Sequence, residues 1–445
     1  MSLCSFVNPL LKPSQRRPAQ DNFPLPALLT SPCYRSQLAN GIVLLVYENP
    51  SANIVAGRLF LRQGSSSEPP EQAGLLALLS ALLTKGSRDR SAHEIAEFVE
   101  SSGASLGTDV ANDYFLVSLK SVAADFPALL TLAAELLRYP SLPDAEFDLE
   151  QRLALEALRS QREQPFNLAY DQLRQSLYGQ HPYALDTLGT ETTLGSLSRD
   201  RLAAAHQQYF RPDQLVISVA GQITPEEAES WVEEVFGDWQ NPPTPAPIAL
   251  LPDRNQPSDR VSQVRQMQQL ILMLGFATVD VRSPDYTALK LLAAYLGNGM
   301  SSRLFVELRE KQSLAYEVSA VFPTRLGPAP FVAYLGTAIE NGPQALAALR
   351  SELDRLSVAL LSSEEVAVTQ RKVLGQYALS KQSNAQIAQL YGWYETLGLG
   401  IDFDQQFPEA IAAVQATDLQ RVAQTWLQQG CLSLVGPEAA IADLI

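Results

Sequence analysis

The residues of this chain follow one plan twice, and this duplication restricts the fold more than any other feature. The segment that begins at Leu142 matches the segment that begins at Leu361, an offset of 219 residues. The positions shared at this offset are Leu142, Glu146, Gln151, Arg152 and Leu155 in the first copy and Leu361, Glu365, Gln370, Arg371 and Leu374 in the second. Near each end, a helix pattern (202–210 and 419–427) leads into a short apolar strand pattern (215–221 and 431–436). A period above about 200 residues indicates a duplicated domain rather than a solenoid of short units.

A proline-rich stretch separates the two copies. Proline lacks a backbone N–H and fixes φ, so a segment rich in it is extended and semi-rigid. The prolines concerned are Pro242, Pro243, Pro245, Pro247, Pro252 and Pro257. We therefore predict four parts, which are an N-terminal tail (1–34), an N-terminal domain (35–240), a linker (241–257) and a C-terminal domain (258–445).

The hydrophobic patterns within the first copy alternate between strand and helix types. Apolar, β-branched runs predict strands at 42–47, 54–61, 113–119 and 215–221. Apolar or amphipathic patterns predict helices at 73–83, 126–137 and 144–161, and a capping box at Ser91 predicts the start of another. The fold class that follows is α+β, with two homologous halves, each a mostly antiparallel sheet with helices packed on one face.

The overall charge and the absence of long apolar runs restrict partners and location. Asp and Glu number 48 against 33 Lys and Arg, which gives a formal net charge of −15. Such a surface repels phosphate backbones, so general nucleic-acid binding is excluded. No stretch reaches the ~18 apolar residues of a membrane span, and we predict a cytoplasmic protein. Residues 1–20 carry Lys12, Arg16 and Arg17 and no acidic residue, so an organellar transit peptide is the alternative.

Histidine and cysteine are too scarce for most metal sites. The chain has three of each, namely His93, His181, His206, Cys4, Cys33 and Cys431. No two histidines lie three or four residues apart, and the cysteines are widely spaced. This distribution argues against a disulfide framework and against a cysteine-based zinc site.

The segment from Gly74 to Ser87 resembles the zinc-site helix of the pitrilysin/insulinase peptidase family, in the branch that includes the mitochondrial processing peptidase. The family pattern is Gly-x-x-His-x-x-Glu-His, an apolar stretch, and then Lys-Gly-Thr/Ser. Gly74 and Lys85-Gly86-Ser87 keep both ends of that pattern. The resemblance covers about residues 35–445 and implies that each of the two domains is peptidase-like.

The resemblance also identifies what this chain lacks. The family's zinc ligands and general base correspond to Ala77, Ser80 and Ala81, and its third ligand, a Glu, corresponds to Ala157. Histidines at i and i+4 place two nitrogen donors on one helix face, and alanine offers no lone pair. Glu156 is one residue out of register, about 100° around the helix. We therefore predict no metal site in this chain and a degenerate zinc site in its N-terminal domain.

A second family motif is retained between Gly297 and Tyr316. In the family, an Arg and a Tyr seven residues apart bind the substrate peptide opposite the zinc, and they correspond to Arg309 and Tyr316. Arg donates several hydrogen bonds to peptide carbonyls, and a Tyr hydroxyl donates to a developing oxyanion. The alternative is that Arg309 forms a surface salt bridge while Tyr316 packs at a strand start.

These features predict that the chain is the non-catalytic subunit of a heterodimeric zinc metallopeptidase. It contributes chamber wall and the substrate-binding Arg309 and Tyr316, while a homologous partner subunit carries the zinc, so no cofactor is expected in this chain. The expected ligand is a peptide, and a homodimer is the alternative assembly. The alternative function is a structural scaffold subunit without a role in proteolysis. A hydrolase with a different site is disfavoured, since no nucleophile–base pair is visible in the sequence.

Overall fold

The computed structural model describes residues 33–244 and 258–444, and most of the predicted linker lies outside these ranges. The N-terminal half contains a six-stranded sheet with the order β1-β2-β6-β3-β5-β4. Its strands are β1 (Tyr34–Gln37), β2 (Val43–Glu48), β3 (Ile54–Leu61), β4 (Ser105–Val110), β5 (Phe115–Val122) and β6 (Leu215–Gly221). Its helices are α1 (Leu75–Leu83), α2 (Ala92–Ser101), α3 (Phe126–Arg138), α4 (Asp144–Glu163), α5 (Pro165–Tyr178), α6 (Glu191–Ser196), α7 (Arg199–Tyr209) and α8 (Pro225–Phe236).

The C-terminal half contains a five-stranded sheet with the order β7-β11-β8-β10-β9. Its strands are β7 (Arg260–Val264), β8 (Gln269–Ala277), β9 (Glu317–Val321), β10 (Pro330–Ala338) and β11 (Cys431–Gly436). Its helices are α9 (Tyr286–Gly297), α10 (Gly342–Val358), α11 (Ser363–Leu379), α12 (Asn384–Thr396), α13 (Phe403–Ala413), α14 (Ala416–Trp426) and α15 (Glu438–Ala442). A π-helix, η6 (Phe305–Lys311), follows α9.

The two sheets repeat one topology. The strand order β2-β6-β3-β5-β4 in the first half has its counterpart in β7-β11-β8-β10-β9 in the second. Each sheet has one parallel pair, β2 with β6 in the first and β7 with β11 in the second. The other pairs of the described strands are antiparallel. The predicted α+β class with two homologous halves is confirmed.

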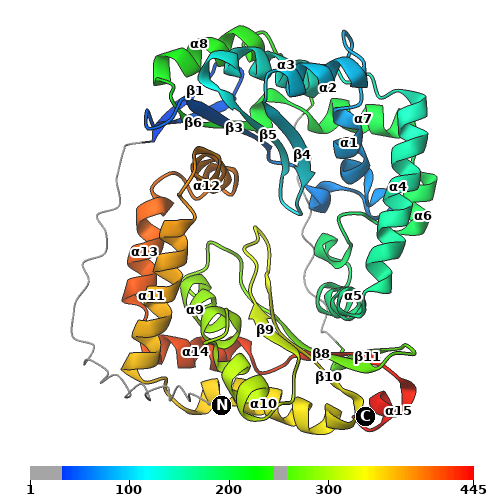
Figure 1. Cartoon of the computed structure of the whole chain (residues 1–445), viewed down its shortest axis with the longest axis vertical. Helices are drawn as coiled ribbons and strands as arrows, with labels where there is room; N and C mark the ends of the chain where they lie inside the picture. The colour runs from blue at the N-terminus through cyan, green and yellow to red at the C-terminus, as the bar shows by residue number, and fades with distance from the viewer. Residues whose placement is uncertain (1–32, 245–257, 445) are drawn as a thin grey trace, which may run out of the picture. The chain divides into compact units, whose positions relative to one another are not determined.

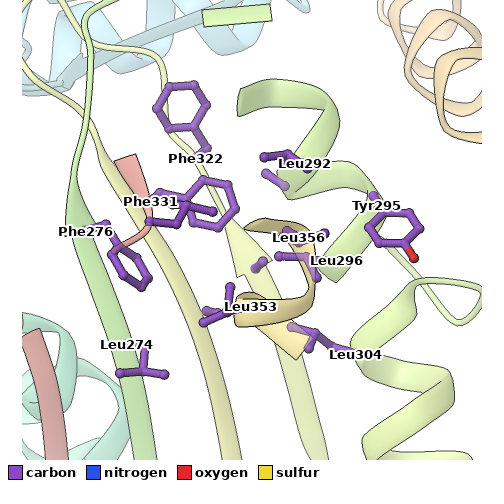
Figure 2. Close-up of a cluster of buried hydrophobic side chains, with 14 of the residues drawn as sticks. Leu274, Phe276, Leu292, Tyr295, Leu296, Leu304, Phe322, Phe331, Leu353 and Leu356 are labelled. Atoms are coloured by element: carbon purple, nitrogen blue, oxygen red, sulfur yellow. The ribbon is translucent and has the colours of Figure 1, made fainter. Parts of the chain in front are cut away.

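Each sheet has one face covered by helices of its own half. In the first half, buried apolar side chains of α1, α3 and α8 belong to one cluster with inward side chains of β2, β3 and β5. Figure 1 shows α3 and α8 over the sheet and α1 beside β4. In the second half, apolar side chains of α9 and α10 pack on one face of the five-stranded sheet. Figure 2 shows this core, with side chains from the sheet facing those of the two helices, namely Leu274, Phe276, Phe331, Leu292, Leu296, Leu353 and Leu356.

The opposite face of each sheet is covered by a helix from the other half, which sequence patterns did not predict. Helix α12 packs on β3 and β6 of the first sheet, where Ile387 and Tyr391 contact Phe60 and Val216 within one buried cluster. Gly392 permits this close approach, because a Cβ atom there would lie 2.5 Å from the Phe60 ring. Helix and sheet therefore fit without space for a side chain at this position.

Helix α5 makes the reciprocal contact with the second sheet. Its apolar side chains join a buried cluster with Ile271, Met273 and Val332. The Gln172 amide donates to Ser433 Oγ at 2.8 Å and to the Leu434 carbonyl at 2.9 Å. Helices α5 and α12 begin 219 residues apart, at Pro165 and Asn384. They are therefore equivalent helices of the internal duplication, and in this exchange each one covers the sheet of the other half.

A buried carboxylate fastens α12 to the first half. Glu395, which is 7% exposed, accepts hydrogen bonds from Arg35 at 2.9 and 3.1 Å and from Arg62 at 3.2 Å. Both arginines belong to the N-terminal half, on β1 and directly after β3. A buried charge is stable only when it is paired, so this network favours a single position of α12 on the sheet.

Candidate functional site

Helix α1 carries the positions at which the family resemblance places zinc ligands. Ala77 and Ala81 lie one turn apart and are partly exposed, whereas Ser80 is 6% exposed. The Glu68 carboxylate anchors the start of this helix by accepting from the backbone N–H of Gly74 at 2.9 Å and of Leu76 at 2.5 Å. Burial raises the pKa of Glu68 to about 8, against the lowering effect of these two donors. The helix is thus held firmly in place without groups that bind metal.

The neighbouring helix α4 holds the third position. It packs against α1, and Ala157 on it is exposed, as is Glu156. Glu150, seven residues before Ala157, is 9% exposed and forms an ion pair with Lys85 Nζ at 2.9 Å. The Glu150 carboxylate is therefore already paired with a lysine of this chain.

The residues present at this site do not fit a zinc ion. Within residues 33–244 and 258–444, no group of three or more His, Cys, Asp or Glu side chains has an arrangement that could hold a metal. The histidines are separately placed: His93 is exposed on α2, His181 is buried, and the ring of His206 is largely enclosed. His206 Nε2 donates to the Leu137 carbonyl at 2.8 Å, and burial lowers its pKa to about 4.

Arg309 lies on the exposed side of the π-helix η6. Its guanidinium stacks on the Phe305 ring at 4.8 Å, and among the described residues it has no ion-pair partner. Arg303, Glu307 and Lys311 form a separate ladder on the same helix, with both cations 2.9 Å from Glu307 Oε1. π-Helical segments are rare and occur frequently at functional sites. The donors of Arg309 are thus turned to solvent while its neighbours pair with one another.

Tyr316 is also presented to solvent. Its side chain is 68% exposed, directly before β9, and its backbone N–H donates to the Gly336 carbonyl at 3.0 Å. Between Arg309 and Tyr316 the chain turns through Ser313, which has a φ of 54°. In the part of the chain that the structure describes, no hydrogen bond or ion pair joins these two side chains to each other or to α1. The residues remain available to an external ligand.

Strand β4 is a part of the site that sequence patterns did not predict. It is one of the two edge strands of the first sheet, and among the described strands it pairs only with β5. It packs beside α1, where Thr108 Oγ1 donates to the Ser80 carbonyl at 2.8 Å. Gly107 and Asp109 weaken its strand character, since both residue types are depleted in strands. The alternation of Leu106, Thr108 and Val110 was the signal that could have identified it.

Comparisons with known proteins agree on one family. Residues 43–191 match the profile described as insulinase (peptidase family M16), and residues 196–373 match the profile of the peptidase M16 inactive domain. The uncharacterized zinc protease YmxG of Bacillus subtilis is 26% identical over 405 residues, covering 89% of this chain and 97% of the relative. The uncharacterized zinc protease SCO5738 of Streptomyces coelicolor is 25% identical, covering 91% of this chain and 89% of the relative.

Solved structures show the same fold. A crystal structure of a peptidase M16 inactive domain from Pseudomonas fluorescens superposes with a TM-score of 0.85 at 24% identity, covering 91% of this chain and 98% of that one. A protease from Helicobacter pylori gives a TM-score of 0.84 at 19% identity, covering 91% and 99%. Among the described residues, no helix combines the length and apolar character needed to cross a bilayer.

Proposed function

Because this chain belongs to the M16 (insulinase) peptidase family, we propose that it is a non-catalytic subunit of a heterodimeric zinc peptidase. In this proposal it binds the peptide, and a homologous partner subunit supplies the zinc and the general base. The observation that carries the proposal is a contrast within one chain: Ala77, Ala81 and Ala157 have lost every donor, whereas Arg309 and Tyr316 are retained and exposed.

Independent catalysis by this chain is disfavoured by its chemistry. Relatives are named zinc proteases, but a zinc peptidase needs three protein ligands and a base for the metal-bound water. Alanine cannot bind a metal, and Ser80 is a poor base. The cleavage step therefore belongs to a different subunit.

The exposed Arg309 supports a role in holding substrate. A guanidinium has five N–H donors, and a peptide carbonyl is a suitable acceptor for them. Tyr316 adds a hydroxyl that can donate to a carbonyl oxygen as negative charge develops on it. Both groups would act on a scissile bond that the partner attacks, so they stabilise a transition state without a metal of their own.

Strand β4 supports an extended peptide as the ligand. An edge strand presents unpaired backbone N–H and C=O groups, and an extended peptide can add to it as a further strand. The free edge of β4 runs beside α1, the helix that bears the catalytic machinery in the family pattern. The net charge of −15 favours basic peptides at long range.

Reconstitution with a zinc-bearing homologous subunit tests the proposal. The isolated chain should contain no stoichiometric zinc and should cleave no peptide, and the complex should cleave. Arg309→Ala in this chain should lower kcat/KM about 10- to 100-fold, since hydrogen bonds to a charged donor contribute about 1.5–3 kcal/mol. Arg371→Ala is the matched control, because Arg371 is exposed and has no ion-pair partner in the described residues. Unchanged activity in Arg309→Ala would favour a scaffold subunit, and one tightly bound zinc per isolated chain would refute the proposal.

A further inference from the structure

A pocket of about 320 Å³ opens next to η6, the helix that carries Arg309, and its floor and walls come from three helices of the C-terminal half. The end of α9 contributes Ala294 and Tyr295, η6 contributes Val306 and Glu307, and α11 contributes Glu364, Val368 and Lys372. We infer that this pocket holds a carboxylate of the bound peptide at Lys372. This inference rests on the proposed function, since it concerns the same bound peptide.

Lys372 is the charge in this pocket that lacks a counterion. Its ammonium makes one long hydrogen bond, 3.4 Å to the Ala294 carbonyl, and no carboxylate of the described residues lies within ion-pair distance. The side chain is partly buried, and this desolvation lowers its pKa. A partly desolvated ammonium gains most from an anionic partner, because a charge-assisted hydrogen bond replaces lost hydration.

The other inward charges of the pocket are already compensated within the chain. Arg303 pairs with Glu307 at 2.9 Å and with Glu352 at 2.7 Å. Glu365 pairs with Arg355 at 3.6 Å and accepts from the Tyr295 hydroxyl and from the Ser362 backbone N–H, both at 2.8 Å. A ligand carboxylate would therefore meet Lys372 without displacing an internal ion pair.

Glu364 is a second charge in the pocket without an ion-pair partner among the residues that the structure describes, and it lies at the opposite end from Lys372. Glu364, Val368 and Lys372 follow one face of α11 at intervals of four residues, so the two charges are about 12 Å apart along the helix axis. This span matches about three to four residues of extended peptide. Glu364 is exposed and well hydrated, so a cation there contributes little, and the buried end at Lys372 dominates recognition.

The pocket and Arg309 lie on different sides of one π-helix. Val306 and Glu307 line the pocket, and Arg309 follows two residues after Glu307, nearly half a helical turn around η6. A peptide held by Arg309 therefore extends past η6 for its carboxylate to enter the pocket. Two sources supply this group, the C-terminus of a short peptide or an Asp or Glu side chain.

Binding of three labelled peptides to the full-length chain distinguishes these sources. The probes are a fluorescein-labelled, lysine-containing decapeptide with a free C-terminus, its C-terminal amide, and an amide whose last residue is Glu, measured by anisotropy. We expect the plain amide to bind at least tenfold more weakly than the free acid. Tight binding of the Glu-containing amide would show that a side-chain carboxylate is sufficient for recognition by the pocket. Weak binding of this amide would show that the pocket recognises the C-terminal carboxylate of the peptide.

Variants of Lys372 test whether the pocket causes the preference for the free acid over the plain amide. Lys372→Gln should make the free acid and the plain amide bind equally, whereas Lys372→Arg should keep the preference. Arg371→Gln on the same helix is the control and should change neither. Arg309→Ala should weaken all three peptides by a similar factor, which tests the proposed function separately. Equal binding of all three peptides to the unmodified chain would overturn the carboxylate site, and undetectable binding of every peptide would overturn both proposals.

Discussion

Individual residues decide what chemistry this chain can perform. Ala77 and Ala81 retain the spacing that two zinc ligands require but offer no donor atoms. Arg309 and Tyr316 keep their donors and are exposed. Their identities and spacing could be predicted from the sequence, because both are properties of the sequence itself. Their exposure could not, because burial depends on residues that pack around them in three dimensions.

A buried histidine makes the stability of the first half depend on pH. The folded pKa of His206 is about 4, below its ordinary value of 6.5, so between these values the unfolded chain binds a proton that the folded chain does not. The free energy of unfolding therefore falls as the pH drops from about 6.5 toward 4. We expect His206 to contribute a loss of about 2 kcal/mol between pH 7.5 and pH 5.

Urea unfolding at both pH values checks this expectation. His206→Gln can still donate to the Leu137 carbonyl and should lack this part of the pH dependence. His93→Gln, which changes an exposed histidine on α2, should retain the full dependence. An identical pH response in the unmodified chain and in His206→Gln would contradict the assignment.

At the level of elements, α1 and α4 hold the positions at which the family resemblance places metal ligands. The capped start of α1, its packing on α4, and the Lys85–Glu150 ion pair hold both helices in place. Two features of this helix pair could be predicted from the sequence, namely the helices and the empty ligand positions. The ion pair with Lys85 could not, because it joins a residue just after α1 to one on α4.

Restoring the ligands should therefore restore zinc binding. The triple variant A77H/A81H/A157E places two nitrogen donors one turn apart on α1 and a carboxylate on the adjacent helix. We expect it to retain about one zinc ion per chain after gel filtration. Metal content by mass spectrometry measures this, and A81H/A157E, with a single histidine, is the control. Equal zinc content in both variants would show that the helices no longer present the site.

Strands at the sheet edges were the least predictable elements. The interior strands β3 and β6 have the bounds that their apolar runs predict, Ile54–Leu61 and Leu215–Gly221. Strands β1 and β4 were not predicted, since each has one unpaired edge and most of its side chains are polar or only partly buried. An edge strand is stabilised by its neighbour rather than by its own hydrophobic pattern, so the sequence carries little trace of it.

For the whole molecule, the exchange of α5 and α12 makes the two halves depend on each other. Each helix covers an apolar sheet face that water would otherwise contact, through the clusters around Phe60 in the first half and Met273 in the second. Burial of apolar surface is the main stabilising contribution in folding, so neither half has a complete core without the other.

Separated halves should accordingly fail to fold alone and recover together. We expect residues 33–244 expressed alone to aggregate or to bind a hydrophobic dye, and to form a one-to-one complex when co-expressed with residues 258–444. Size-exclusion chromatography and circular dichroism measure both outcomes. A chain cut at a protease site inserted within 245–257 is the control and should elute as one species. A monodisperse, cooperatively unfolding N-terminal half would contradict this mutual dependence.

The sequence by itself determined the duplication, the α+β class and the absence of metal donors at residues 77, 81 and 157, because these follow from residue type and spacing along the chain. Only the tertiary structure decided which helix covers each second sheet face. Within the described ranges, it alone also decided that β4 is a free edge beside α1 and that Lys372 lacks a counterion. The physical reason is that coverage, pairing and desolvation depend on contacts between residues far apart in the chain. Such contacts, like the one between Glu395 and Arg35, leave no local pattern that a reading of the sequence could detect.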